Sequence, residues 1–319
     1  MAPLGIAVVG AGPWGLTLAR ALGRVEQADL RWICDLDEGR LAAATGLAAR
    51  VTTRLDDVLA DPDVAAVAVA VDLPAHHPVG LRVLRSRRHL LLEKPMASSA
   101  AEGRELLAAA AEAERLLTVG DLLLHHPVVR RVQKLTAEGV LGDAIYFAST
   151  RATPGPARAA GSTWWALAPH DVSLALSLLG ALPVGVSAVG GAYTAPDHDN
   201  IASATLQFSG GRTAHLRVAR FAGEKQRRFS LAGTRRTVTF DEIDEARPLA
   251  VWDGKGVETL PASALEAVDP LLSQCRAFVT SAVRGEVGAG NGEHALAVVR
   301  VLEAGARSMR LGGQPVEVA

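Results

Sequence analysis

The sequence predicts an α/β domain with a doubly wound parallel sheet, followed by an α+β domain with a large, mostly antiparallel open sheet. Strand-like and helix-like segments alternate over residues 1–120, as they do where helices connect parallel strands. Over residues 121–319, strand-like segments follow one another closely without intervening helices, which favours antiparallel pairing. A length of 319 residues also suggests about two domains.

The composition is that of a globular protein, with 49% hydrophobic and 21% charged residues and a formal net charge of −1. Basic and acidic residues are interspersed, so no nucleic-acid or membrane partner is indicated. The two cysteines, Cys34 and Cys275, form neither a disulfide framework nor a metal-binding spacing. With no signal-like or membrane-spanning stretch, we expect a cytoplasmic protein that binds no metal.

The first segment carries a dinucleotide-binding signature. An apolar run, Leu4–Val9, leads into glycines spaced G-x-G-x-x-G and then into helix-compatible sequence: Gly10-Ala11-Gly12-Pro13-Trp14-Gly15. Gly10 permits a tight turn, Gly12 lets the backbone approach a pyrophosphate, and Gly15 lets helix and strand pack closely. The amino terminus of the helix would then face the phosphates with N–H groups and a partial positive charge.

An acid at the end of the next strand supports this interpretation. The strand-like segment Leu30–Cys34 ends at Asp35, at about the distance expected for the carboxylate that binds the adenosine ribose. A carboxylate there repels a 2′-phosphate, so Asp35 predicts NAD rather than NADP. The alternative is a glycine turn followed by a solvated carboxylate, and the order of the elements argues against it.

The rest of the first domain alternates regularly. We expect helices at Glu38–Ala43, Asp56–Leu59, Pro78–Arg87 and Ala100–Leu117. The strands expected between and after them are Arg50–Thr52, Val64–Val71, His89–Leu92 and Leu116–Gly120. Two of these strands deliver polar loops, Asp72–His76 and Glu93–Pro95, to the carboxyl edge of the predicted sheet. Ligands of doubly wound folds bind at that edge.

The second domain reads as helices followed by hairpin-connected strands. We expect helices at Pro127–Glu138, Pro169–Leu179, Leu271–Val283 and Gly292–Arg307, and a loop over Thr153–Ser162. The expected strands are Ala144–Arg151, Gly185–Gly190, Ile201–Phe208, Thr213–Val218, Lys225–Leu231, Arg236–Phe240 and Leu249–Trp252. Because a large open sheet needs its second face covered, we expect a homodimer or homotetramer formed through that face.

Two residues are the main catalytic candidates. Lys94 follows a strand end at the predicted crevice, where it could bind a substrate oxygen; an exposed lysine paired with Glu93 is the alternative. His170 follows Pro169, so we expect it in the first helical turn, where the helix dipole disfavours its charged form. A capping or packed histidine is the alternative. Asp171 should point about 100° away from His170 along the helix.

Weaker candidates lie near the predicted crevice or in the second domain. His76, His125 and His126 lie near the predicted crevice loops, but no i,i+4 pair with a carboxylate suggests a metal site. The neighbouring Trp164 and Trp165 could form an apolar platform for a sugar ring or belong to the core. Arg151 could bind an anionic or polyhydroxylated substrate, although a solvated arginine is the commoner outcome.

Taken together, these motifs resemble those of the Gfo/Idh/MocA family of oxidoreductases, nearly from end to end. The resemblance rests on the glycine turn and on Cys34–Asp37, Glu93–Ala97, Leu167–Ser173, Val298–Ser308 and Gly312–Val316. It implies a Rossmann domain, an open-sheet domain, and hydride transfer between a nicotinamide and a hydroxyl-bearing carbon of a sugar, sugar nucleotide or cyclitol. In the family pattern Lys94 and His170 flank the reacting oxygen, and the Lys94–Pro95 peptide is often cis.

The resemblance also implies two sets of binding residues. We expect NAD to contact Gly10, Ala11, Gly12, Pro13, Trp14, Gly15, Asp35, Arg40, Val71, Asp72, Leu73, His76, Glu93 and Lys94. We expect the substrate to contact His125, Arg151, Trp164, Trp165 and His170.

The sequence departs from the family pattern at three places. Ala166 replaces a common aspartate four residues before the histidine, Val71-Asp72 replaces a Thr-Pro pair, and no tyrosine acid has a counterpart near His170. Ala166 removes an Asp–His proton relay, which leaves Lys94, a water or the substrate to complete the path. The alternatives are a keto- or imine reductase of a specialised biosynthetic pathway and a non-catalytic, cofactor-sensing regulator.

Overall fold

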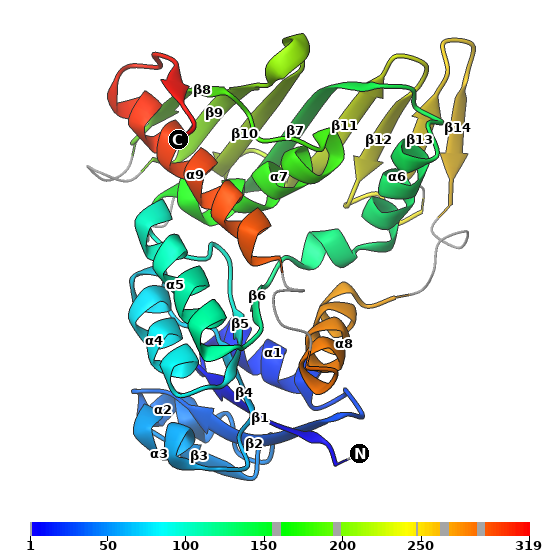
Figure 1. Cartoon of the computed structure of the whole chain (residues 1–319). Coiled ribbons are helices and arrows are strands. Elements are labelled where there is room, and N and C mark those ends of the chain that lie inside the picture. The colour runs from blue at the N-terminus through cyan, green and yellow to red at the C-terminus, as the bar shows by residue number, and fades with distance from the viewer. Residues whose placement is uncertain (1, 155–160, 194–198, 247, 262–267, 286–290) are drawn as a thin grey trace. The chain divides into compact units, whose positions relative to one another are not determined.

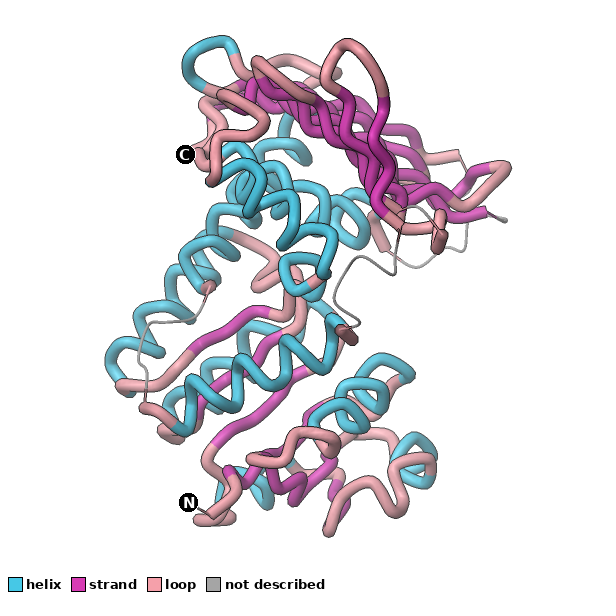
Figure 2. Tube along the Cα trace, turned by 90° about the vertical axis from the view of Figure 1, so that its right-hand side faces the viewer, coloured by secondary structure: helices cyan, strands magenta, loops and turns pink. Residues whose placement is uncertain are grey.

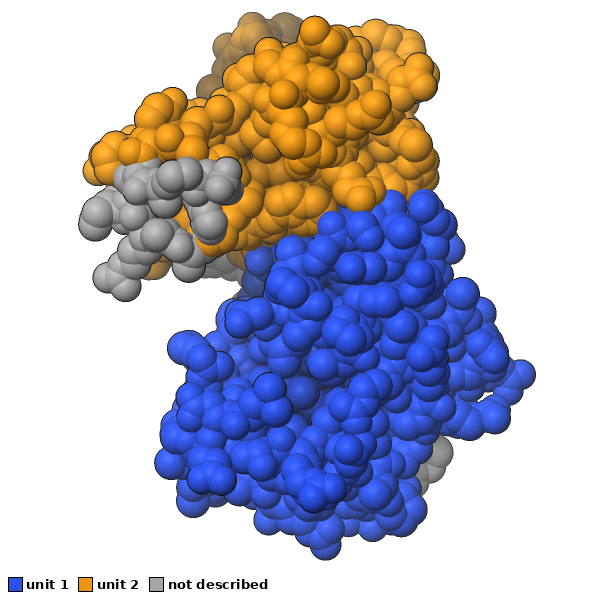
Figure 3. Space-filling view, turned by 90° about the vertical axis from the view of Figure 1, so that its left-hand side faces the viewer, with its two compact units in different colours: residues 1–125, 268–299 blue, residues 126–267, 300–319 orange. Residues whose placement is uncertain are grey.

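The protein forms two compact units, which Figure 3 shows in different colours. This computed structural model describes residues 2–154, 161–193, 199–246, 248–261, 268–285 and 291–319. Unit 1 comprises residues 1–125 and 268–299, and unit 2 comprises residues 126–267 and 300–319. Within the described ranges, no helix combines the length and apolarity needed to cross a membrane.

Unit 1 contains the predicted doubly wound parallel sheet (Figure 1). Its strand order is β3-β2-β1-β4-β5-β6, and every pair is parallel. The strands are β1 (Leu4–Val9), β2 (Ala28–Cys34), β3 (Arg50–Thr52), β4 (Ala66–Val69), β5 (His89–Leu92) and β6 (Leu117–Val119). The order reverses between β1 and β4, and ligands of such sheets bind at that point, beyond the carboxyl ends of the strands.

Helices connect these strands and bury their apolar faces against the sheet. They are α1 (Pro13–Leu22), α2 (Glu38–Ala42), α3 (Leu55–Ala60), α4 (Leu73–Arg85), α5 (Ala100–Ala113) and the 3₁₀ turn η1 (Leu122–His125). Helix α4 contacts α5, and α1 contacts α8 (Pro270–Val283). Strand β4 is buried along its whole length, as expected of a parallel strand covered on both faces.

Helix α8 lies far along the chain yet belongs to unit 1. Its apolar side chains Leu272, Phe278 and Val279 join the core formed by β1, β2 and α1. The division therefore differs from the boundary expected at residue 120, which assigned all of 121–319 to the second domain. The order of elements along the chain suggested that boundary. The structure differs because the apolar face of α8 is buried in the core of unit 1.

Unit 2 contains the predicted open, mostly antiparallel sheet, in the order β14-β13-β12-β11-β7-β10-β9-β8-β15. Only the β7–β10 pair is parallel among its described strands. Its elements are α6 (Pro127–Ala137), β7 (Ala144–Pro154), α7 (Thr163–Leu179), β8 (Gly185–Gly191), β9 (Ile201–Gln207), η2 (Ser209–Gly211), β10 (Thr213–Ala222), β11 (Gln226–Gly233), β12 (Thr237–Asp241), β13 (Leu249–Trp252), β14 (Val257–Leu260), β15 (Val316–Glu317) and part of α9 (Gly292–Arg310). The short edge strands β14 and β15 were not predicted.

Helices cover one face of this sheet, and no helix among the described residues covers the other, here called the bare face (Figure 2). Helix α7 contacts β7, β9 and β10 on the covered face. Burial alternates along β9, as period-two side-chain placement requires. The bare face carries small and polar side chains, among them Thr150, Ser203, Thr205, His215 and Arg217.

Helix α7 begins earlier than predicted, which changes the setting of His170. The helix starts at Thr163 because the Ser162 hydroxyl accepts the Trp165 N–H (3.2 Å), and Asp199 Oδ2 accepts the Trp164 N–H (2.7 Å). Pro169 lies inside the helix, where it removes a single backbone donor. The expectation that His170 occupies the first turn is therefore wrong, and the dipole argument does not apply to it.

Two further boundaries differ from expectation. Helix α4 begins at Leu73, so most of the loop expected at residues 72–76 is helical. Helix α5 ends at Ala113 instead of Leu117, because Glu114 adopts a left-handed conformation with φ of 54°. The predicted loop over Thr153–Ser162 lies mostly outside the described residues, while Thr153 and Pro154 still belong to β7.

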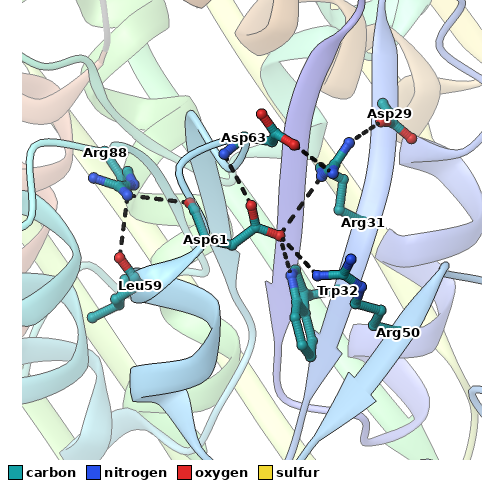
Figure 4. A network of polar contacts seen from close by, with 8 residues as sticks. All are labelled: Asp29, Arg31, Trp32, Arg50, Leu59, Asp61, Asp63 and Arg88. Atoms are coloured by element: carbon teal, nitrogen blue, oxygen red, sulfur yellow. Dashed lines mark hydrogen bonds and ion pairs between the residues drawn. The ribbon is translucent and has the colours of Figure 1, made fainter.

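A polar network surrounds Asp61 in the connection between α3 and β4 (Figure 4). Its Oδ2 accepts the Trp32 indole N–H (2.8 Å) and lies 3.5 Å from Arg50 Nη1 and 3.8 Å from Arg31 Nε. Its Oδ1 accepts the Asp63 N–H (2.9 Å). The Trp32 hydrogen bond, first among these contacts, holds the pKa of Asp61 below its usual range. One carboxylate thus contacts side chains from β2 and β3 and the backbone of the turn that leads into β4.

We predict that Asp61→Ala lowers the free energy of unfolding by about 1–3 kcal/mol, because partly buried donors lose their shared acceptor. Asp29→Ala serves as the control. Asp29 pairs with Arg31 at 3.0 Å but is half exposed, so its loss costs about 0–1 kcal/mol. Urea unfolding of both variants tests this. Equal stabilities would contradict a central role for Asp61.

Candidate functional site

The glycine turn between β1 and α1 leaves no room for side chains on its protein side. Gly10 has φ of +102°, and a Cβ there would lie 2.3 Å from the Ala70 carbonyl oxygen. A Cβ on Gly15 would lie 1.9 Å from the Gly10 carbonyl oxygen. Both distances are far shorter than van der Waals contact, so the two glycines let α1 and the end of β4 pack directly against the turn.

Gly12 faces open space instead. Apart from its own neighbours along the chain, no described residue has an atom within 4 Å of the position that its Cβ would take. It caps α1 without a side-chain hydrogen bond, and Pro13 occupies the first helical position. The free amino terminus of α1 therefore borders an open cradle that suits a phosphate group.

Asp35 lies beside this cradle at the end of β2. Its Oδ2 accepts the Ala11 N–H (2.6 Å) and its Oδ1 accepts the Asp37 N–H (2.9 Å). The residue is only 8% exposed, and each oxygen retains a lone pair for a further donor. The exposed Arg40 has its Nη1 3.9 Å from Asp35 Oδ2. This arrangement can hold a ribose hydroxyl as predicted.

The segment after β4 faces the same edge of the sheet. Asp72 caps α4 without a side-chain bond, and Leu73 and His76 lie in the first turns of that helix. His76 is buried, with Nδ1 2.9 Å from the Pro95 carbonyl oxygen and Nε2 3.0 Å from that of Val71. Burial lowers the pKa of His76, and the two ring nitrogens contact carbonyl oxygens from two loops. A direct contact of this ring with NAD does not fit its burial.

Glu93 and Lys94 follow β5, the neighbour of β4. The Lys94–Pro95 peptide is cis, as the resemblance implied. Glu93 is 8% exposed, and its Oε2 lies 3.3 Å from the Lys94 backbone nitrogen, which donates to it. The glycine turn, Val71 and Lys94 therefore follow β1, β4 and β5, which are adjacent in the sheet.

In unit 2, Arg151 and Asp171 form a buried ion pair. Arg151 Nε donates to Asp171 Oδ2 at 2.8 Å, and Arg151 Nη1 lies 3.6 Å from Glu242. Arg227 binds the same glutamate at 2.8 Å. The Arg151 guanidinium is therefore committed to the protein's own carboxylates, contrary to its expected role as a substrate ligand. The pair instead joins α7, which carries His170, to β7.

The tryptophan pair divides between core and surface. Trp164 is fully buried, its indole N–H donates to the Leu302 carbonyl (2.9 Å), and Gly305 makes room for its ring. A substrate-binding role for Trp164 is therefore wrong. Trp165 is partly exposed on the same helix. His125 ends η1, and His126 caps α6 through Nδ1, which accepts the Val128 N–H (3.2 Å).

Sequence comparison agrees with this geometry. The profile described as "Oxidoreductase family, NAD-binding Rossmann fold" matches residues 4–121, and the family's C-terminal domain profile matches residues 129–239. The chain belongs to the GFO/IDH/MocA family. Unit 1 thus contains an NAD-binding Rossmann fold, and the protein belongs to a family of oxidoreductases.

Individual relatives cover most of the chain. UDP-N-acetylglucosamine 3-dehydrogenase of Acidithiobacillus ferrooxidans is 27% identical over 82% of each chain. Inositol 2-dehydrogenase 2 of Paenarthrobacter aurescens is 30% identical over 60% of each chain. The crystal structure of GenD2 from gentamicin A biosynthesis, in complex with NAD, has a TM-score of 0.87 at 29% identity and covers 100% of this chain and 97% of its own.

The residues present fit NAD. The open cradle at Gly12 and the uncapped amino terminus of α1 match a pyrophosphate. The carboxylate of Asp35 matches a ribose. Sequence reasoning did not single out Asp121 or Gln274, two buried polar residues near Glu93. Asp121 directly follows the β6 segment and could have been noticed for its position. Gln274 gave no local signal, because only the fold brings α8 to this region.

We predict that Gly12→Ala weakens NAD binding at least about tenfold, which corresponds to about 1.4 kcal/mol. The added methyl group enters the open cradle without touching protein atoms, so thermal stability should not fall. Gly23→Ala, at the other end of α1, adds a methyl group in ordinary contact and is the matched control. Calorimetric NAD titration tests this; unchanged affinity in Gly12→Ala would contradict the assigned cradle.

Proposed function

We propose that the protein transfers a hydride between NAD and a hydroxyl-bearing carbon of a sugar, sugar nucleotide or cyclitol, with Lys94 and His170 as its polar acid–base pair. The observation that carries this proposal is the placement of the glycine turn and the Lys94 turn beyond β1 and β5, the two strands on either side of β4 in one sheet. The sugar and inositol dehydrogenases among the relatives support the substrate class.

When bound, NAD accepts or returns the hydride. The chain's own residues supply the remaining functions. The Lys94 side chain binds the reacting oxygen and stabilises the negative charge that develops there, and His170 exchanges the hydroxyl proton. The buried Arg151–Asp171 pair holds α7 against β7 and so fixes the backbone that carries His170.

The same residues serve either direction of the reaction. In the reducing direction, the Lys94 side chain polarises a carbonyl and His170 returns the proton to the new hydroxyl. The relation to GenD2, whose structure is attributed to gentamicin A biosynthesis, supports a specialised biosynthetic pathway as the alternative setting. Comparing the oxidation of sugar alcohols with the reduction of ketones and imines distinguishes the two.

We further propose that unit 2 provides the substrate-binding surface and a subunit interface. The bare face of its sheet includes a shallow hollow lined by Thr150, Ser187, Ser203, Thr205 and Arg217. Two flat faces built mostly of small and polar side chains can pack closely against each other, which an isologous dimer requires. Exposed Val189 and Trp252 add apolar area to strands of the same sheet.

We predict that Lys94→Ala lowers kcat by at least about a hundredfold, the usual scale for a group that transfers a proton or polarises the reacting oxygen. NAD binding should persist, because the glycine turn is unchanged. Lys134→Ala, which removes an exposed lysine of α6, is the control. Steady-state kinetics with a panel of sugars and cyclitols test this. Undiminished turnover in Lys94→Ala would remove the lysine from the mechanism.

We predict that Thr205→Arg converts the oligomer to monomers, because a long charged side chain in the middle of a flat, small-residue face prevents two faces from meeting. Glu138→Arg, at the exposed end of α6, should leave the mass unchanged. Light scattering measures both. A wild-type monomer at micromolar concentration would exclude the interface.

A further inference from the structure

A buried polar cluster lies beyond the carboxyl ends of β5 and β6 in unit 1. Four separate segments supply it: Trp14 from α1, Glu93 after β5, Asp121 after β6 and Gln274 from α8. Glu93, Asp121 and Gln274 are only 8%, 8% and 2% exposed. Burying this many polar groups is costly unless they serve each other or a function, yet the proposed chemistry uses none of them directly.

Glu93 links the two parts of the NAD site. Its Oε2 accepts the backbone N–H of Lys94, at 3.3 Å, and its carboxyl also accepts a hydrogen bond from the Trp14 indole. Trp14 belongs to the glycine turn, where it is 39% exposed. The carboxyl therefore connects the turn that cradles the pyrophosphate to the backbone that carries the catalytic lysine.

The second carboxyl oxygen and the Gln274 amide both lie close to Gly120. A Cβ on Gly120 would lie 3.0 Å from Glu93 Oε1 and 3.2 Å from Gln274 Nε2, so the absence of a side chain at Gly120 lets both groups approach the same point. Among the described residues, Glu93 Oε1 and both amide atoms of Gln274 have no hydrogen-bond partner. Glu93 Oε1 and the Gln274 amide can therefore each form a further hydrogen bond, and both lie beside Gly120.

The surroundings of Glu93 oppose a negative charge. A backbone amide and an indole, which are neutral groups, donate to its carboxyl. Burial raises the pKa of Glu93, and the Asp121 carboxylate acts in the same direction; the Trp14 hydrogen bond and the Lys94 charge oppose them without reversing the shift. The titratable groups that face Glu93 are Lys94, Asp121 and, from α8, Cys275, whose pKa Glu93 helps to raise.

We propose that Glu93 is a positioning residue that works as the neutral acid, donating its Oε1–H to the Gln274 carbonyl while Oε2 holds the Lys94 backbone and the Trp14 indole. Rotation of the Gln274 amide by 180° presents its oxygen in place of its nitrogen, and the two orientations occupy the same volume. A neutral acid fixes the backbone of Lys94 without forming an ion pair with the ammonium group.

This inference rests on the proposed function only for its catalytic consequence. Its structural part is testable without substrate. If Glu93 stays protonated when folded but ionises when unfolded, the native state binds the extra proton. Stability then falls as pH rises from the unfolded pKa of a glutamate towards the raised folded pKa of Glu93.

The first experiment compares the full-length wild type with Glu93→Gln and, as a matched control, Glu105→Gln, which changes a mostly exposed glutamate. Infrared spectra at neutral pH should show a protonated carboxyl stretch in the wild type and Glu105→Gln that is missing from Glu93→Gln. Gln274→Met, which removes the proton acceptor, should shift that band to higher frequency. A wild-type spectrum without a band that depends on Glu93 would overturn the proposal, whatever the enzyme's substrate.

The second experiment measures thermal stability and kcat against pH. Glu93→Gln keeps a neutral carbonyl and donor, so its midpoint should fall less with rising pH than that of the wild type. Its kcat should exceed that of Glu93→Ala at least about tenfold, which is about 1.4 kcal/mol, with similar KM for NAD. Equal kcat in both variants would show that a neutral hydrogen-bonding side chain at this position does not support Lys94. A Glu93→Gln midpoint lower than that of the wild type at every pH would show that the ionised carboxylate is needed. Either result would overturn the proposal.

Discussion

The close approach of backbone to backbone at the glycine turn is the constraint on which the NAD site depends. The Gly10 carbonyl oxygen lies where a side chain on Gly15 would begin, and the Ala70 carbonyl lies where one on Gly10 would begin. No other residue type fits these positions without moving α1 or β4. That packing brings the amino terminus of α1 to the point where the strand order reverses, so the cradle, the Val71 loop and the Lys94 turn meet at one edge.

Polar side chains then fix the loops that the strands deliver. Asp35 accepts backbone N–H groups from Ala11 and Asp37, and His76 lies between the carbonyl oxygens of Val71 and Pro95. Each therefore holds main-chain segments from two parts of the sequence. Loops held in this way lose less freedom when a ligand binds, which favours binding. The same logic applies to Glu93, whose carboxyl connects the glycine turn to Lys94.

Local sequence signals predicted the elements that depend on local chemistry. The glycine spacing and Asp35 indicated a dinucleotide site because turn geometry and helix capping are short-range effects. The start of α7 was misplaced because Pro169 suggested a first turn, whereas the Ser162 cap and the distant Asp199 determine where the helix begins. The packing of α8 into unit 1 and the burial of Trp164 against Leu302 also depend on contacts between residues far apart in sequence. No periodicity within a short window reveals such contacts.

Ala166 replaces the aspartate of the family pattern, and this replacement bears on the role of the Glu93 cluster beside Lys94. In the proposed mechanism the Asp–His relay of the family pattern is missing, and the charge of Lys94 is the group proposed to stabilise the reacting oxygen. An ionised carboxylate next to that lysine would compete with the substrate oxygen for the ammonium group. A glutamate that remains neutral, held between the Trp14 indole and Gln274, avoids this competition while still fixing the backbone. Burial of Glu93 beside Asp121 is therefore consistent with the role proposed for Lys94. The same proposal gives a role to the buried Gln274 amide, which lies beside Gly120 after β6.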